Sequence, residues 1–122
     1  MTRDEARAFA DEWAAAWNER DVERVLSHFD DDVSFTSPTA LAVVGVATVR
    51  GKQALREYWN TALARISSLR FAVDRVSWDP GSRELAIIYV SDTGRKKHVS
   101  ENLVFGANGL VVRAEVFHGV EV

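Results

Sequence analysis

The chain has 122 residues and a formal net charge of −3, and 47% of its residues are hydrophobic and 27% charged. This length suits one domain with one core, and the negative charge argues against a nucleic-acid binder, because phosphate recognition needs a clustered positive field. Cysteine is absent, which excludes disulfides and thiolate chemistry, and no segment has the apolar length of a signal peptide or a membrane span, so we expect a single cytoplasmic domain over residues 1–122 with no membrane partner.

The first predicted element is a helix that runs to about residue 18. Thr2 and Glu5 have the spacing of a capping box, and apolar residues follow at helical intervals. Asp21 can cap a second, shorter helix whose apolar stripe ends at Phe29. The three aspartates at 30–32 then predict an exposed turn, since three adjacent like charges favour solvent.

A strand is predicted at residues 33–37, where polar and apolar residues alternate until Pro38. Residues 39–50 are apolar without a clear period. They fit either a short helix followed by a strand or a flap over a pocket. A third helix is expected over residues 54–66, because apolar residues recur there at helical spacing after Gly51.

The remaining residues predict four strands joined by short turns, at 70–78, 83–91, 97–105 and 110–118. Short turns between successive strands imply an antiparallel meander. Helices gathered on one side of an antiparallel sheet make an α+β domain. Because about three helices cannot cover both faces of a twisted sheet, we expect the sheet to curl around them and to leave a hollow at its open end.

Glu101 interrupts an otherwise apolar strand face, which it shares with Val99, Leu103 and Phe105. Burying a carboxylate without a partner is costly. By parity His118 shares a face with Val116 on the next strand, so the hairpin can bring Glu101 and His118 together as a general acid and base. Glu101 can instead hydrogen-bond a helix tryptophan or a backbone amide and serve the fold alone.

Three segments resemble the nuclear transport factor 2-like superfamily, in particular its SnoaL-like and ketosteroid-isomerase-like bacterial members. They are AWNERDVERVLSHFDDDVSFTSP, VRGKQALREYW and ENLVFGANGLV. The resemblance spans essentially the whole chain. It implies a strongly curved antiparallel sheet wrapped around the helices as a cone, with an apolar interior that takes a ligand at the wide end. It also implies a homodimer through the convex face of the sheet.

The resemblance further implies where site residues lie. The catalytic base of the isomerases falls on Ser37, their tyrosine on Trp13 and their late-strand acid on Glu101, so two of the three groups differ and steroid isomerisation by that arrangement is not expected. We expect Glu101 and His118 as catalytic candidates, with neither a metal nor a cofactor. The expected ligand-binding residues are Trp13, Trp17, Phe35, Ser37, Trp59, Leu103 and Val116.

The function this predicts is the binding of a small hydrophobic molecule. If the protein is an enzyme, Glu101 would serve as acid and base in a cofactor-independent isomerisation, dehydration or cyclisation of a small carbonyl compound. The alternative is a module of the same fold that binds a ligand, or dimerises, without catalysis. Fold resemblance alone does not decide between them.

Overall fold

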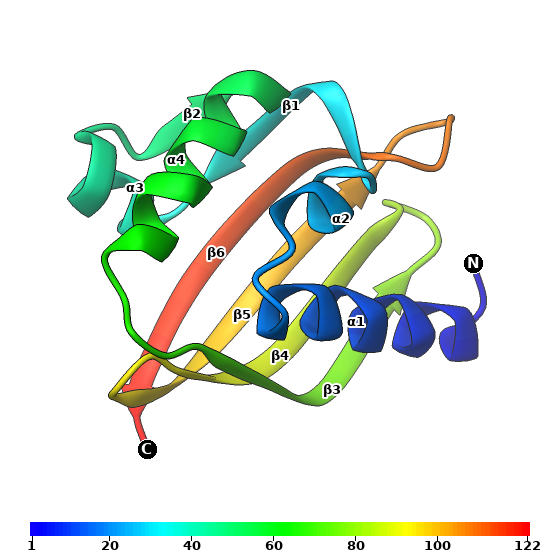
Figure 1. Ribbon diagram of the computed structural model, residues 1–122. Coiled ribbons are helices and arrows are strands. Elements are labelled where there is room, and N and C mark those ends of the chain that lie inside the picture. The colour runs from blue at the N-terminus through cyan, green and yellow to red at the C-terminus, as the bar shows by residue number, and fades with distance from the viewer.

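The computed structural model describes residues 1–122 as four helices packed on one curved, unclosed six-stranded sheet (Figure 1). The first half of the chain contains α1 (Arg3–Asn18), α2 (Val22–Leu26), β1 (Phe29–Thr36), α3 (Pro38–Val44), β2 (Thr48–Arg50) and α4 (Lys52–Ala64). The second half contains β3 (Arg70–Asp79), β4 (Glu84–Asp92), β5 (Lys96–Phe105) and β6 (Val111–Glu121). The predicted α+β class and the curling of the sheet around the helices are confirmed. None of the helices is both long and apolar enough to cross a membrane.

Helix α1 begins and ends where the sequence predicts. The Thr2 hydroxyl accepts a hydrogen bond from the Glu5 amide at 3.1 Å, and the Glu5 carboxylate accepts one from the Thr2 amide at 2.8 Å, which completes the capping box. At the other end, the Asn18 side chain donates to the Phe71 carbonyl at 3.0 Å and accepts from the Phe71 amide at 2.7 Å. Asn18 therefore fastens α1 to β3, which is an edge strand of the sheet.

The region after α2 differs from the prediction. The second helix ends at Leu26, and β1 already begins at Phe29, so the exposed turn predicted for the three aspartates is wrong. The strand tolerates them because Phe29 and Val33 face the core, whereas Asp31 and Asp32 are exposed. For residues 39–50, the structure has a short helix followed by a strand, α3 and β2, which is one of the two predicted alternatives.

The sheet has the strand order β2-β1-β6-β5-β4-β3. Strands β3 to β6 form the predicted antiparallel meander. Strand β1, however, lies parallel to β6, with Phe35 opposite Ala114, so the expectation of a wholly antiparallel sheet is wrong at this pair. Turn lengths constrain only strands that are neighbours in sequence, and β1 and β6 are distant along the chain.

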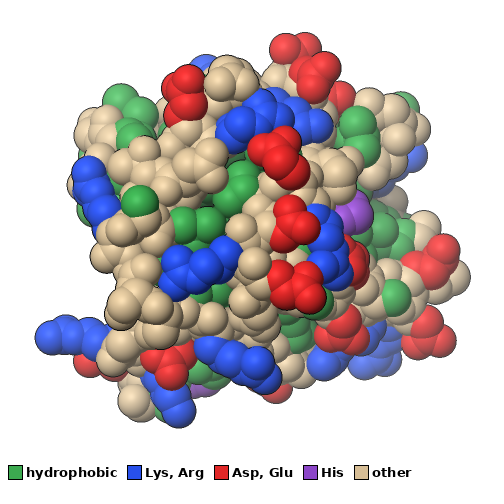
Figure 2. Space-filling view, viewed as in Figure 1, with side chains coloured by type: hydrophobic (Ala, Val, Ile, Leu, Met, Phe, Trp, Pro, Cys, Tyr) green, Lys and Arg blue, Asp and Glu red, His purple; other side chains and the backbone are tan.

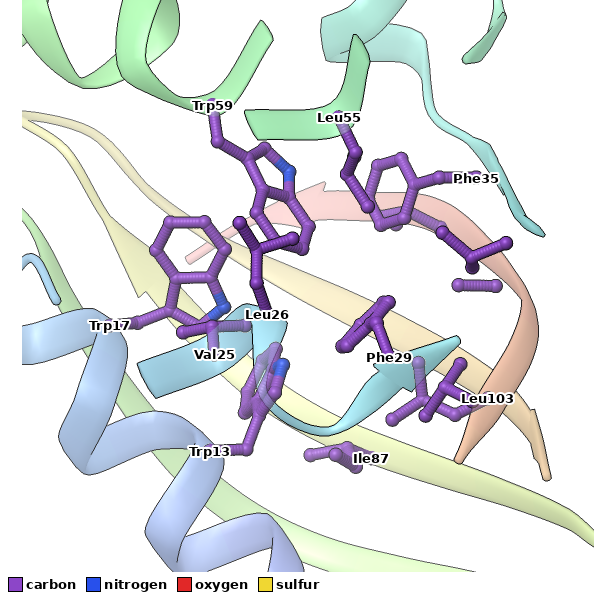
Figure 3. Packing of buried hydrophobic residues seen from close by; sticks show 14 of the residues in the cluster. Trp13, Trp17, Val25, Leu26, Phe29, Phe35, Leu55, Trp59, Ile87 and Leu103 are labelled. Atoms are coloured by element: carbon purple, nitrogen blue, oxygen red, sulfur yellow. The ribbon is translucent and has the colours of Figure 1, made fainter. Parts of the chain in front are cut away.

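The core lies between the concave face of the sheet and helices α1 and α4. Figure 3 shows Trp13 and Trp17 projecting from α1, and Leu55 and Trp59 projecting from α4 toward them. The rings of Trp17 and Trp59 meet edge to face with centroids 4.8 Å apart. This ring contact joins the two helices, and both rings also line the pocket described below.

Candidate functional site

A pocket of about 240 Å³ opens between α1, α4 and the concave face of the sheet. Its walls are largely aromatic, formed by Trp13, Trp17, Phe35, Trp59 and Phe71. The space-filling view shows hydrophobic side chains at the floor of a hollow near the centre of this face, with both basic and acidic side chains around it (Figure 2). A mostly apolar wall with a smaller number of polar groups is the usual construction of a small-molecule site.

Glu101 is the one carboxyl among the residues that line this pocket, and it is only 4% exposed. It projects from β5 between Ile87 of β4 and Val116 of β6. Its Oε1 accepts a hydrogen bond of 3.0 Å from the Tyr89 hydroxyl, whereas Oε2 has no hydrogen-bond partner in the protein. Burial raises the pKa of Glu101 to about 7, and the Tyr89 hydrogen bond lowers it only in part. Both protonation forms of Glu101 are therefore populated near neutral pH.

Two tyrosines accompany Glu101 in the pocket, Tyr89 on β4 and Tyr58 on α4. Burial raises the pKa of Tyr89 well above its usual value, and the nearby Glu101 charge adds to the effect. Burial likewise raises the pKa of Tyr58 to about 12. Both side chains therefore remain neutral phenols at neutral pH and act as hydrogen-bond donors.

His118 lies apart from Glu101. The register of β5 and β6 places it opposite Val99, while Glu101 lies opposite Val116. The His118 Nδ1 is 3.2 Å from the Lys97 Nζ, and the residue is exposed at the wide end of the pocket. No hydrogen bond joins the two predicted catalytic residues, so the structure does not form the acid–base pair that parity allows.

The predicted ligand-binding residues separate into two groups. Most of them line the pocket, namely Trp13, Trp17, Phe35, Ser37, Trp59 and Val116. Leu103 does not: it is fully buried on the next inward position of β5, deeper than Glu101 and opposite Leu85 and Ala114. Core side chains fill the space around Leu103, so the pocket does not extend to it.

Trp13 and Ser37 occupy the positions that the resemblance assigns to the tyrosine and the base of the isomerases, and their surroundings differ from each other. The Trp13 Nε1 is buried and has no acceptor, so this indole is not the partner of Glu101. The Ser37 hydroxyl accepts a hydrogen bond of 3.1 Å from the Thr39 amide and caps α3, whose Thr39 and Val43 also line the pocket. No group of three or more His, Asp or Glu side chains is placed to hold a metal ion.

Sequence reasoning missed Tyr89, Tyr58 and Lys97. Tyr89 lies in an apolar run, and the available signal was its parity with Ile87 and Ser91, which are buried on the inner face of β4. Lys97 shares the inward parity of Val99 and Glu101 but belongs to a basic triplet that is typical of an exposed hairpin tip. Tyr58 stands in the apolar stripe of α4, where a core role is the default interpretation.

The model of the SnoaL-like domain matches residues 10–118. A crystal structure of a SnoaL-like protein of unknown function from Burkholderia thailandensis is 30% identical, with 98% of each chain covered and a TM-score of 0.87. A search of curated proteins finds no match.

More distant structures share the fold. An NTF2-like protein of unknown function from Burkholderia pseudomallei is 17% identical over 97% of this chain and 92% of its own, with a TM-score of 0.78. The epoxide hydrolase/cyclase-like enzyme SalBIII, which has a role in pyran ring formation in the polyether salinomycin, is 17% identical over 96% of this chain and 92% of its own, with a TM-score of 0.76.

Proposed function

The chain belongs to the SnoaL-like domain family, and from this premise we propose that it binds a small hydrophobic carbonyl compound in the pocket and moves a proton on it through Glu101. One observation carries the proposal: a single buried carboxyl, with one oxygen held by Tyr89 and the other without a partner, stands in a pocket whose lining is mostly apolar and holds no second carboxyl. Isolated titratable groups with raised pKa values in such pockets are typical of acid–base sites.

The chemistry uses both forms of Glu101. As a carboxylate it accepts a proton from the carbon beside the carbonyl, and as the acid so formed it returns the proton to another carbon or to a leaving hydroxyl. A pKa near the working pH suits this double role. Tyr58, a neutral phenol in the pocket wall, can donate a hydrogen bond to the carbonyl oxygen as negative charge develops there. Isomerisation through an enolate, elimination of a β-hydroxyl as water and ring closure of the aldol type each begin with this step.

The test is the exchange of α-protons of tetralone for deuterium, followed by NMR. The wild type is expected to accelerate exchange over buffer, faster as the pH rises through about 7 and the carboxylate forms. Glu101→Gln should slow the catalysed exchange by about a hundredfold or more. Glu57→Gln is the matched control, because Glu57 is exposed on α4 and does not line the pocket.

Binding is measured in parallel by quenching of the tryptophans that line the pocket. Glu101→Gln should bind tetralone within about threefold of the wild type, since the pocket walls are unchanged. Equal exchange rates for the wild type and Glu101→Gln would remove Glu101 as the base. Binding without accelerated exchange would favour the non-catalytic ligand-binding module.

We also propose that the outer face of the sheet forms a homodimer. The side chain of Phe117 is 54% exposed there, beside a shallow depression whose lining includes Ile88, His98 and Ser100. A large apolar side chain among polar neighbours is typical of an interface of moderate polarity. Light scattering should give a dimer for the wild type and a monomer for Phe117→Glu; a monomeric wild type would refute the interface.

A further inference from the structure

The wide end of the pocket is cationic. Besides Glu101, the charged side chains that line the pocket are Lys97 and Arg65. Lys97 is half-buried on β5 and faces inward with Val99 and Glu101, and Arg65 caps the C-terminal end of α4. Figure 1 shows this end of α4 on the same side of the molecule as the β4–β5 turn that precedes Lys97.

Neither cation is neutralised within the protein. No ion pair of the structure includes Lys97 or Arg65. The register places Glu121 opposite Lys97, but the Glu121 carboxylate instead lies 3.4 Å from the Arg95 guanidinium. The Lys97 ammonium is half-buried and the Arg65 side chain is exposed, so both can make charge-assisted hydrogen bonds to a ligand anion at the pocket.

His118 adds a donor rather than a third charge. Burial lowers the pKa of His118, and the neighbouring Lys97 lowers it further. The imidazole is therefore neutral at neutral pH, with Nδ1 accepting from the Lys97 ammonium at 3.2 Å and Nε2–H left to donate. The wide end of the pocket thus offers positive charge and hydrogen-bond donors but no carboxylate.

The inner end of the pocket, around Glu101, disfavours a bound anion. Glu101 lies four residues beyond Lys97 on the same face of β5, roughly 13 Å away at about 3.3 Å per residue. The aromatic walls lie along this interval, and a ligand anion beside the Glu101 carboxyl would meet a like charge in a desolvated space. A bound anion is thereby directed to the wide end.

We infer that the ligand of this pocket is an amphipathic carboxylate, with its acid group on Lys97 and Arg65 and an apolar body of about two fused rings reaching toward Glu101. This inference rests on the proposed function, because it specifies the molecule on which Glu101 acts. It also fixes the orientation of that molecule, with the reacting carbon at the end remote from the acid group.

The test compares naphthoate with naphthamide, two probes of nearly the same shape of which only the first is charged. Titrations follow the quenching of the pocket tryptophans Trp13, Trp17 and Trp59. The wild type is expected to bind naphthoate about tenfold more tightly than naphthamide, as one charge-assisted hydrogen bond would give. Added salt should weaken the binding of naphthoate alone.

Substitutions test whether Lys97 is the side chain that binds the carboxylate. Lys97→Gln should weaken naphthoate about tenfold and leave naphthamide within about twofold, and Lys97→Arg should restore most of the loss. The matched control is Lys96→Gln, because Lys96 is exposed at the adjacent position and does not line the pocket. It should bind both probes like the wild type. Thermal unfolding of each variant confirms that it is folded.

The outcomes separate this inference from the proposed function. Equal affinity of the wild type for the two probes, or equal weakening of both by Lys97→Gln, would overturn the carboxylate preference while the hydrophobic pocket stands. Binding of neither probe would overturn the proposed function and this inference together.

Discussion

Replacing Glu101 by glutamine should make the folded protein more stable at high pH. Burial raises the pKa of Glu101 from its ordinary 4.5 to about 7, so between these values the native state binds more protons than the unfolded state. The free energy of unfolding therefore falls as the pH rises through this window. Because one pKa unit is worth about 1.4 kcal/mol, the full penalty above the window is about 3 kcal/mol.

Glutamine removes this penalty with little other change. It has the size of glutamate and stays neutral, and its carbonyl oxygen can still accept the hydrogen bond from Tyr89. We expect Glu101→Gln and the wild type to have similar free energies of unfolding near pH 4, where the glutamate is protonated in both states. The variant should then gain progressively, to about 3 kcal/mol near pH 8.

Urea denaturation of both proteins at a series of pH values measures this difference, and other titrating groups cancel in the subtraction. Glu57→Gln, at an exposed position on α4, should stay within about 0.5 kcal/mol of the wild type at every pH. Tyr89→Phe should extend the window to higher pH, because it removes the hydrogen bond that lowers the pKa of Glu101 in the native state. A Glu101→Gln difference that stays constant with pH would refute the reasoning.

Other substitutions probe the frame around the pocket. Leu103→Ala should lower the free energy of unfolding by about 2–5 kcal/mol, because Leu103 is fully buried and its removal leaves a cavity. The same variant should bind naphthamide within about twofold of the wild type in the fluorescence titration, because Leu103 does not line the pocket. Asn18→Ala should lower it by about 1–3 kcal/mol in urea denaturation, since the Phe71 amide and carbonyl lose their partner; an unchanged midpoint would show that water replaces the side chain. Thr2→Ala should reduce it by about 1 kcal/mol through loss of the capping box, with Thr61→Ala on α4 as a surface control.

The sequence predicts best where the signal is local. The capping box, the stripe of α1 and the turns of the meander each depend on residues a few positions apart, and all were placed within a few residues. The aspartates at 30–32 misled because charge patterning indicates exposure and not backbone conformation. Asp31 and Asp32 are exposed as expected, yet they lie in a strand.

At the site, the sequence predicts which side chains face inward but not which of them meet. Parity predicts that Glu101 faces inward, and it does. It does not predict that Glu101 meets Tyr89, because that contact is diagonal across two strands and depends on their register. Nor does it reveal that His118 lies opposite Val99, since a register shift between Val104 and Phe105, near the hairpin turn, changes the pairing of the residues that follow. Contacts between strands require the three-dimensional alignment that a single sequence leaves open.

The parallel pairing of β1 with β6 has a consequence for how the chain acquires its structure. Strand β1 is an early element, yet one of its two neighbours in the sheet is the last strand, with Phe29 opposite Val111 and Phe35 opposite Ala114. Long-range pairing of this kind forms slowly, because a large loop must close first. During synthesis, the hairpins of β3 to β6 can assemble as they emerge, whereas β1 must wait for β6. We therefore expect the pocket wall around Phe35 to be completed late in folding.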